Sequence, residues 1–278
     1  MRSMLLSVSV LACAAGVASA VGDISTVNGY RVEARIFNDQ PTTNLTINGT
    51  SYPAPGAGMI AGAAGPIVFD EQFTALTPGG NTNKHVAWLS TDGGASRFGM
   101  NPGQSWDLQF NVRIDAPAGS PRKEAGIEIH NPRLANNPPF TDEGQVLIAS
   151  DGEVAVFGAA MPFTGLGFIY TLGTTAHVRM QFFAAGVHHP SLGAYQLDFT
   201  DAVNGLHSSG IKIWGNEADG TIGFNTDTAI GFKAQNSRNP FINDTSVITY
   251  NNISVVPAPT AAALFGVAGL AAFRRRRA

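Results

Sequence analysis

Two glutamates and a histidine within one short segment have the side chains best suited to chemistry. Segment 123–130 alternates apolar and polar residues as a strand does, so Glu124, Glu128 and His130 are expected to share its outward face. Retaining glycosidases need two carboxylates about 5 Å apart, whereas four residues of strand separate Glu124 from Glu128 by about 13 Å. The spacing therefore predicts no catalytic pair. Glu128 and His130 are instead predicted to bind a ligand, because Gly126 between the two glutamates lets a ligand approach the backbone.

Three tryptophans could stack on sugar rings if they are exposed. Trp106 begins an alternating strand and is expected in the core. Trp214 stands at a predicted strand end, directly before Gly215, and is the preferred candidate for ligand binding.

Metal ligation has little support in the sequence. His188 and His189 are adjacent, so on a strand they point to opposite faces, and no third residue has matching spacing. Oxygen-rich turns around Asp151, Asp219 and Asp227 could hold calcium, although Asp-Gly is also a common turn signal. We predict no cofactor, with a calcium ion at one of these turns as the alternative.

The elements that position these residues are short strands. The clearest is 106–114, in which five apolar residues share one face and four polar residues share the other. Turn signals such as Asn48-Gly49 and Asp151-Gly152 separate such segments, and 168–171 is expected to be a further strand. The Gly/Ala/Pro-rich segment 53–66 is expected to be a surface excursion. The pattern predicts an all-β fold, a jelly-roll-type antiparallel β-sandwich occupying residues 21–255.

Several strands of this body together resemble concanavalin-like or laminin-G-like sandwiches. The resemblance lies in a Trp-led strand at 106–114 and in KEAGIEIH, GIKIW, IGFKA and YNNISV, which follow it in that order. It implies a two-sheet fold of the kind that binds carbohydrate.

The segment 256–278 has three parts, each with its own physical meaning. Val256-Pro257-Ala258-Pro259 is extended, a 14-residue apolar run follows, and Arg274, Arg275, Arg276 and Arg277 form a strong stop to membrane passage. This order resembles the PEP-CTERM sorting signal of bacterial exported proteins, with Ala258 in place of the name-giving glutamate. The resemblance implies a short transmembrane helix and transient membrane association. It also implies cleavage near Pro257–Pro259 by an exosortase-type membrane protease. A permanent anchor is the alternative, but it needs roughly 20 apolar residues.

The N-terminal segment independently predicts export. Arg2 is followed by an apolar run and by the small residues Ala18, Ser19 and Ala20, as in a signal peptide helix cleaved after residue 20. The only cysteine, Cys13, lies inside this segment, so the mature chain is expected to have neither thiol nor disulfide. Lipid attachment at Cys13 is the alternative.

Charge and motifs limit the function further. Without residues 1–20 and 256–278, 12 basic and 20 acidic residues remain, a net charge of −8 that argues against nucleic acid as a partner. No nucleophile elbow, phosphate-binding glycine loop or zinc helix motif occurs. The sequence predicts a non-catalytic cell-surface or matrix protein that binds polysaccharide or matrix components. A secreted glycoside hydrolase or lyase is the alternative.

Overall fold

The computed structural model describes residues 28–37, 43–53, 57–61, 66–73, 82–100, 103–117, 120–130, 144–158, 161–216, 221–222, 228–237 and 245–257. The signal cleavage residues Ala18 and Ala20 lie outside this part of the chain, as do Pro259 and Arg274–Arg277. The predictions of terminal helices therefore also fall outside it. Within it, no helix is long and apolar enough to cross a bilayer.

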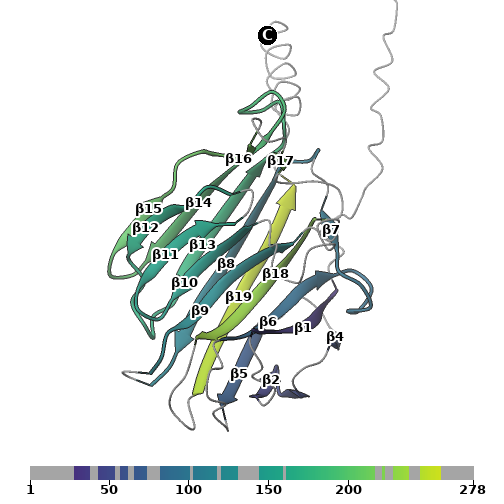
Figure 1. Cartoon of the computed structure of the whole chain (residues 1–278), viewed down its shortest axis with the longest axis vertical. Coiled ribbons are helices and arrows are strands. Elements are labelled where there is room, and N and C mark those ends of the chain that lie inside the picture. Colours follow the sequence, from purple (N-terminus) through teal and green to yellow (C-terminus); the bar gives the residue numbers. More distant parts are fainter. Residues whose placement is uncertain are drawn as a thin grey trace, which may run out of the picture.

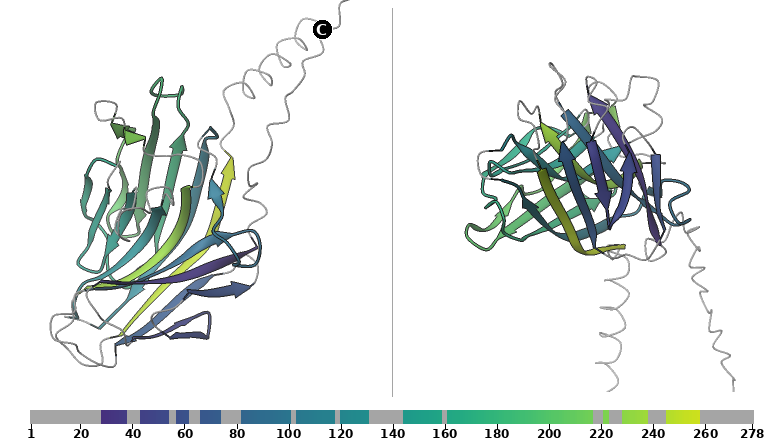
Figure 2. Two further views of the ribbon diagram at one scale, coloured as in Figure 1. Left: turned by 45° about the vertical axis from the view of Figure 1, so that its right-hand side comes forward. Right: turned by 90° about the horizontal axis from the view of Figure 1, so that it is seen from below.

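The described residues form two antiparallel sheets, labelled in Figure 1 and seen stacked as two layers in Figure 2. We call them sheet A and sheet B. Sheet A follows the order β12-β11-β10-β9-β18-β6-β1-β4, with β7 beside β18. Its strands are β1 (Gly29–Phe37), β4 (Ala57–Ala61), β6 (Thr82–Ser90), β7 (Gly99–Met100), β9 (Lys123–His130), β10 (Gly144–Ala149), β11 (Glu153–Phe157), β12 (Thr164–Phe168) and β18 (Thr228–Ser237).

Sheet B follows the order β17-β16-β14-β13-β8-β19-β5-β2-β3, with β15 beside β14. Its strands are β2 (Thr43–Ile47), β3 (Thr50–Pro53), β5 (Ile67–Phe73), β8 (Trp106–Asp115), β13 (Ala176–Phe183), β14 (Gly193–Asp201), β15 (Gly205–Ser208), β16 (Lys212–Asn216), β17 (Thr221–Ile222) and β19 (Thr245–Pro257). Consecutive strands change sheet at β1–β2, β3–β4, β4–β5, β5–β6, β7–β8, β8–β9, β12–β13, β17–β18 and β18–β19. This is the predicted all-β, jelly-roll-type sandwich.

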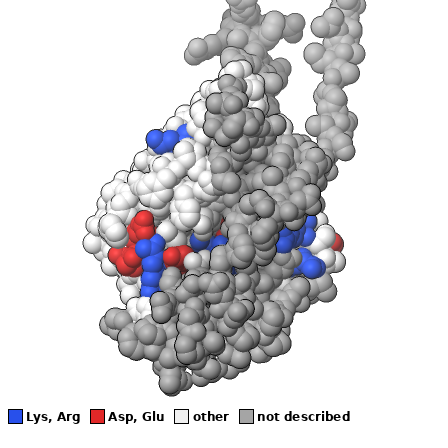
Figure 3. Space-filling model, viewed as in Figure 1, with Lys and Arg blue, Asp and Glu red and all other residues white. Residues whose placement is uncertain are grey.

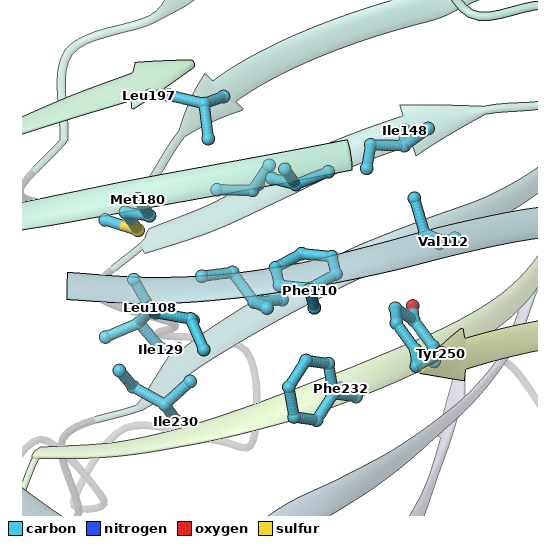
Figure 4. Close-up of a cluster of buried hydrophobic side chains, with 14 of the residues drawn as sticks. Leu108, Phe110, Val112, Ile129, Ile148, Met180, Leu197, Ile230, Phe232 and Tyr250 are labelled. Atoms are coloured by element: carbon cyan, nitrogen blue, oxygen red, sulfur yellow. The ribbon is translucent and has the colours of Figure 1, made fainter. Parts of the chain in front are cut away.

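The core lies between the two sheets because each central strand turns its alternate apolar residues inward. On β8 the inward residues Leu108, Phe110, Val112 and Ile114 are fully buried. Phe110 packs edge-on against Phe232 of sheet A, with ring centroids 5.3 Å apart, and Figure 4 shows these rings beside Tyr250. Burying aromatic side chains of this size contributes about 2–3 kcal/mol each. The prediction that Trp106 belongs to the core is confirmed, since its ring is buried and stacks on Phe182 at 5.4 Å.

Two predicted hairpin turns are confirmed. Asn48 and Gly49 join β2 to β3 with φ values of 48° and 78°, which suit a type I′ turn. Asp151 and Gly152 join β10 to β11, where Gly152 has a φ of 101° and its N–H donates to the Ala149 carbonyl at 2.9 Å. Only glycine adopts such a φ without strain.

Three predictions of local structure are wrong. The expected excursion at 53–66 contains β4, which pairs with β1. The strand expected at 168–171 is instead β12 at 164–168. The two glycines of β12 hide its strand pattern in the sequence. Tyr170 lies beyond the end of β12, and its buried hydroxyl accepts a hydrogen bond from the Ile114 N–H at 2.7 Å. Finally, β19 continues through Val256 to Pro257, because its pairing with β8 extends to Trp106.

Candidate functional site

The face of sheet A that points away from the core carries unexpected polarity. We call it the outer face of sheet A, and it includes the alternate residues of β10, β9, β18 and β6. Strand pairing arranges these residues in three rows. The rows are Gln145–Glu128–Gly231–Trp88, Leu147–Gly126–Lys233–Val86 and Ala149–Glu124–Gln235–Lys84.

A buried ion pair crosses this face. The Lys84 ammonium donates to both carboxylate oxygens of Glu128 at 2.8 Å, and the two side chains are 3% and 1% exposed. The pair spans β18, on which Gly231 is in register with Glu128 and Gln235 is in register with Lys84. A charge buried in this way is tolerated only when it is paired, so each partner fixes the position of the other.

A second buried lysine reaches across β9. Lys233 is fully buried, pairs with Gly126 in the register, and donates from Nζ to the side-chain oxygen of Gln145 on β10. Gly126 has a φ of 121°, and a Cβ there would lie 1.9 Å from the Val146 carbonyl oxygen. Its N–H donates to the Tyr250 hydroxyl of sheet B at 2.7 Å. Gly126 thus brings β9 close to β10 and ties the two sheets together.

A more exposed charged cluster continues the face toward β11. Gln235 donates to Glu124 at 2.7 Å, and Arg122 bridges Glu124, Asp151 and Glu153 at 2.9, 2.8 and 2.6 Å. Figure 3 shows that charged side chains on the visible described surface are confined to a few patches. The cluster orients the half-buried amide of Gln235.

The opposite end of the outer face is basic and aromatic. The Arg97 guanidinium lies 4.4 Å from the centre of the buried Trp88 ring, and Arg31 pairs with Trp88 across β1 and β6. The Arg31 guanidinium donates to the Ala95 carbonyl at 2.9 Å. Both arginines are half-buried.

The predicted ligand residues are therefore placed as follows. Glu124 and Glu128 share the outer face as expected, but Glu128 belongs to a buried ion pair and not to a solvated surface. His130 ends β9 and pairs with Ala229, and its side chain lies outside the described part. Residues Asp219 and Asp227 also lie outside it.

The prediction that Trp214 binds ligand is wrong. Its side chain is 0% exposed and packs edge-on against Phe182 and Tyr195, with centroids 5.7 and 6.0 Å apart. Trp214 pairs with Gly193, and the lack of a side chain at Gly193 leaves room for Phe182 beneath the indole. The ring is therefore part of the core.

The candidate metal residues have other contacts. Asp151 pairs with Arg122 and also accepts from the Glu153 N–H at 3.2 Å, as a turn residue does. His188 packs edge-on against Phe183 at 4.5 Å, while His189 Nδ1 accepts from the Leu192 N–H at 3.2 Å. Across the described ranges, no three His, Cys, Asp or Glu side chains are grouped to hold a metal ion.

A polar cluster lies inside the sandwich and was not predicted from the sequence. Glu71 and His85 are buried between the sheets, with Oε1 and Nδ1 3.6 Å apart. Lys123 also faces inward, and burial lowers its pKa to about 8 against the opposing charge of Glu71. Burial lowers the pKa of His85 to about 4. These residues lie on three different strands, so alternation within one strand could not reveal them.

His85 is expected to make folding sensitive to acid. Its pKa is 6.5 when exposed and about 4 when folded, so between these values the unfolded chain binds a proton that the folded chain does not. Acidification from pH 7 to pH 4 therefore removes up to about 3 kcal/mol of stability through this group. Urea unfolding at both pH values should show a smaller acid loss in His85→Leu than in the parent. Equal losses would contradict this role.

Comparisons with known proteins concern the fold. The sequence matches no protein-family model and no curated protein. Similar solved structures include alginate lyase AlgAT5 of polysaccharide lyase family 7, with a TM-score of 0.46, 13% identity, and coverage of 84% of this chain and 96% of that one. The alginate lyase from Klebsiella pneumoniae gives a TM-score of 0.47 and 10% identity, with 84% and 96% covered. Lectin II from Ulex europaeus gives a TM-score of 0.42 and 9% identity, with 81% and 98% covered.

These similarities correct one prediction. The sequence predicted a protein without enzymatic activity, but several of the similar structures are alginate lyases. Lectins are also among the similar structures.

Proposed function

We propose that the protein is exported and binds a polysaccharide on the outer face of sheet A. The observation that carries this proposal is the organisation of that face: a buried Lys84–Glu128 pair and a buried Lys233 beneath half-buried amides and guanidiniums. A buried charged frame of this kind fixes the more exposed groups, and fixed groups lose little freedom when a ligand binds.

The half-buried groups match the chemistry of a sugar chain. The amides of Gln145 and Gln235 can exchange hydrogen bonds with hydroxyl groups, and Arg31 and Arg97 can donate to a carboxylate. The two arginines lie at one end of the face, beside Trp88. We therefore expect stronger binding to a polysaccharide that contains uronic acids than to a neutral one.

Cleavage of that polysaccharide is a second candidate, favoured by the contact between a carboxylate and an ammonium group. Elimination next to a uronate requires a base for the proton and a cation for the carboxylate. Glu128 and Lys84 are one of each, but both are buried and bonded to each other, so they would act only if the pair opened to the polysaccharide. Hydrolysis by paired carboxylates is less well supported, because Glu124 and Glu128 are held by different partners, Arg122 and Lys84.

One experiment tests both candidates. The purified protein is incubated with a panel of neutral and uronate-containing polysaccharides, and binding and the unsaturated products of elimination are measured together. Binding to polyuronates is the expected result, and product formation would add the second candidate. Neither binding nor product with any polysaccharide would contradict the proposal.

We further propose that both chain ends are processed, on the sequence pattern alone. The expected mature protein begins at Val21 and ends near Pro257–Pro259, after cleavage by an exosortase-type protease. Mass spectrometry of the protein from its native host reads both ends. Material that still carries Arg277 would contradict C-terminal processing.

A further inference from the structure

A lysine and an asparagine lie side by side between the two sheets. Lys123 on β9 and Asn236 on β18 are direct partners in the strand register, and both side chains are fully buried. Residues paired in this way point to the same face and have Cβ atoms about 5 Å apart. The Lys123 amine can therefore reach the Asn236 side-chain amide without any change in the pairing of β9 with β18.

Sheet B places a carboxylate and a hydroxyl opposite this pair. Glu71 on β5 and Ser246 on β19 are also register partners, and both are buried. The Ser246 hydroxyl donates to the side-chain oxygen of Asn236 at 3.1 Å. The Glu71 carboxylate is near enough to act on the charge of Lys123. Four strands thus bring an amine, an amide, a carboxylate and a hydroxyl into one internal cluster.

Two features of this cluster suit a chemical reaction. Burial lowers the pKa of Lys123 to about 8, so a much larger share of its amine is neutral and nucleophilic than in an exposed lysine, whose pKa is about 10.4. Within the described part of the chain, the side-chain nitrogen of Asn236 has no hydrogen-bond partner. A buried polar atom in that state costs stability, and its departure would remove the cost.

We propose that Lys123 and Asn236 become joined by an amide bond between Nζ and the side-chain carbon Cγ, formed within the folded chain. The neutral amine attacks Cγ, a new C–N bond forms, and the bond between Cγ and Nδ2 breaks. Glu71 accepts a proton from the attacking nitrogen and passes a proton to Nδ2, which leaves as ammonia. The atoms balance without an oxidant or a second reactant.

The neighbouring groups favour this step. As the amine attacks, negative charge develops on the Asn236 side-chain oxygen, where the Ser246 hydroxyl already donates. His85 Nδ1 lies 3.6 Å from Glu71 Oε1, but its pKa of about 4 keeps the ring neutral at pH 7, so it does not compete with Lys123 as a cation. The packed sheets hold the reacting groups together, which replaces an encounter in solution by a reaction within one molecule.

The bond would cross-link two neighbouring strands of sheet A. A link between residues far apart in the sequence restricts the unfolded chain, as a disulfide does. The only cysteine of the sequence, Cys13, lies in the segment expected to be removed on export, so a disulfide cannot supply such a link in the mature chain. An amide also resists the reducing agents that open disulfides.

Mass spectrometry of the purified, denatured protein tests the proposal. The intact mass should be about 17 Da below the mass calculated from the sequence between the observed chain ends, because one ammonia is lost. Segments 123–133 and 234–238 are each bounded by tryptic sites, so digestion should yield them as one joined peptide. The joined peptide distinguishes the bond from an equal mass loss by succinimide formation at Asn48-Gly49.

Three variants assign the reacting groups. Asn236→Asp should still give the joined peptide but lose about 18 Da, because water leaves in place of ammonia. Glu71→Gln, with its fold checked by circular dichroism, should keep its full mass because the proton carrier is gone. The control Lys212→Arg replaces a half-buried lysine on β16 and should keep the loss of about 17 Da.

The parent protein decides the proposal even where a variant fails to fold. A parent with its full calculated mass and two separate peptides would overturn it, as would a mass loss without the joined peptide. A joined peptide formed equally well in folded Glu71→Gln would overturn the role of Glu71 as proton carrier.

Discussion

Replacing Lys84 by methionine is expected to lower the free energy of unfolding by about 3–5 kcal/mol, because it removes the ammonium that donates to both oxygens of the buried Glu128 carboxylate. The cost is large because both side chains of the pair are almost completely removed from solvent. Urea unfolding at neutral pH, followed by tryptophan fluorescence, measures it directly.

The double variant Lys84→Met/Glu128→Leu is the matched control. It removes both charges and keeps similar volumes, so its stability should return to within about 1.5 kcal/mol of the parent. The single variant then tests the pairing and not the loss of side-chain volume. A single variant that loses less than about 1 kcal/mol would show that Lys84 is not needed to hold the Glu128 charge, contrary to the buried ion pair described above.

Replacing Gly126 by alanine is expected to destabilise the fold by about 3–5 kcal/mol, through backbone strain at positive φ together with a steric clash. The added Cβ would lie 1.9 Å from the Val146 carbonyl oxygen, and neither backbone can move without disturbing the β9–β10 pairing. The bond between the Gly126 N–H and the Tyr250 hydroxyl would be displaced as well.

The control for this substitution is Gly186→Ala. Gly186 has a φ of 90°, but a Cβ there meets nothing within 4 Å, so only the strain of about 1–2 kcal/mol is expected. The difference between the two variants measures the clash. Equal losses would mean that β9 and β10 can separate at Gly126, contrary to the close approach described above.

The sequence was sufficient to predict those strands and turns whose structure is decided by residues that are neighbours along the chain. The bounds predicted for β9 are those observed, and β8 was predicted to within one residue, because strict alternation identifies a strand without reference to its neighbours. The turns at Asn48-Gly49 and Asp151-Gly152 were also correct, since positive φ values restrict these positions to a few residue types.

Contacts between strands could not be predicted in this way. Glu128 was expected to face solvent, but its partner Lys84 is 44 residues away and lies two strands across the sheet. Lys233 contacts Gln145 from 88 residues away. Trp214 was misplaced for the same reason, because the space it fills is created by Gly193 on the neighbouring strand. The positions of all three side chains depend on the register between strands, and the alternation of apolar and polar residues along one strand does not encode that register.

The most direct test of the central claim compares the outer faces of the two sheets. Gln145→Ala/Gln235→Ala alters sheet A, while Gln181→Ala/Gln196→Ala removes two half-buried amides from paired positions on the outer face of sheet B. Isothermal titration with a polyuronate of defined length should show about 10- to 100-fold weaker binding for the first variant and no change for the second. Unchanged binding in the first variant, with a loss in the second, would place the sugar on the other sheet and contradict the account.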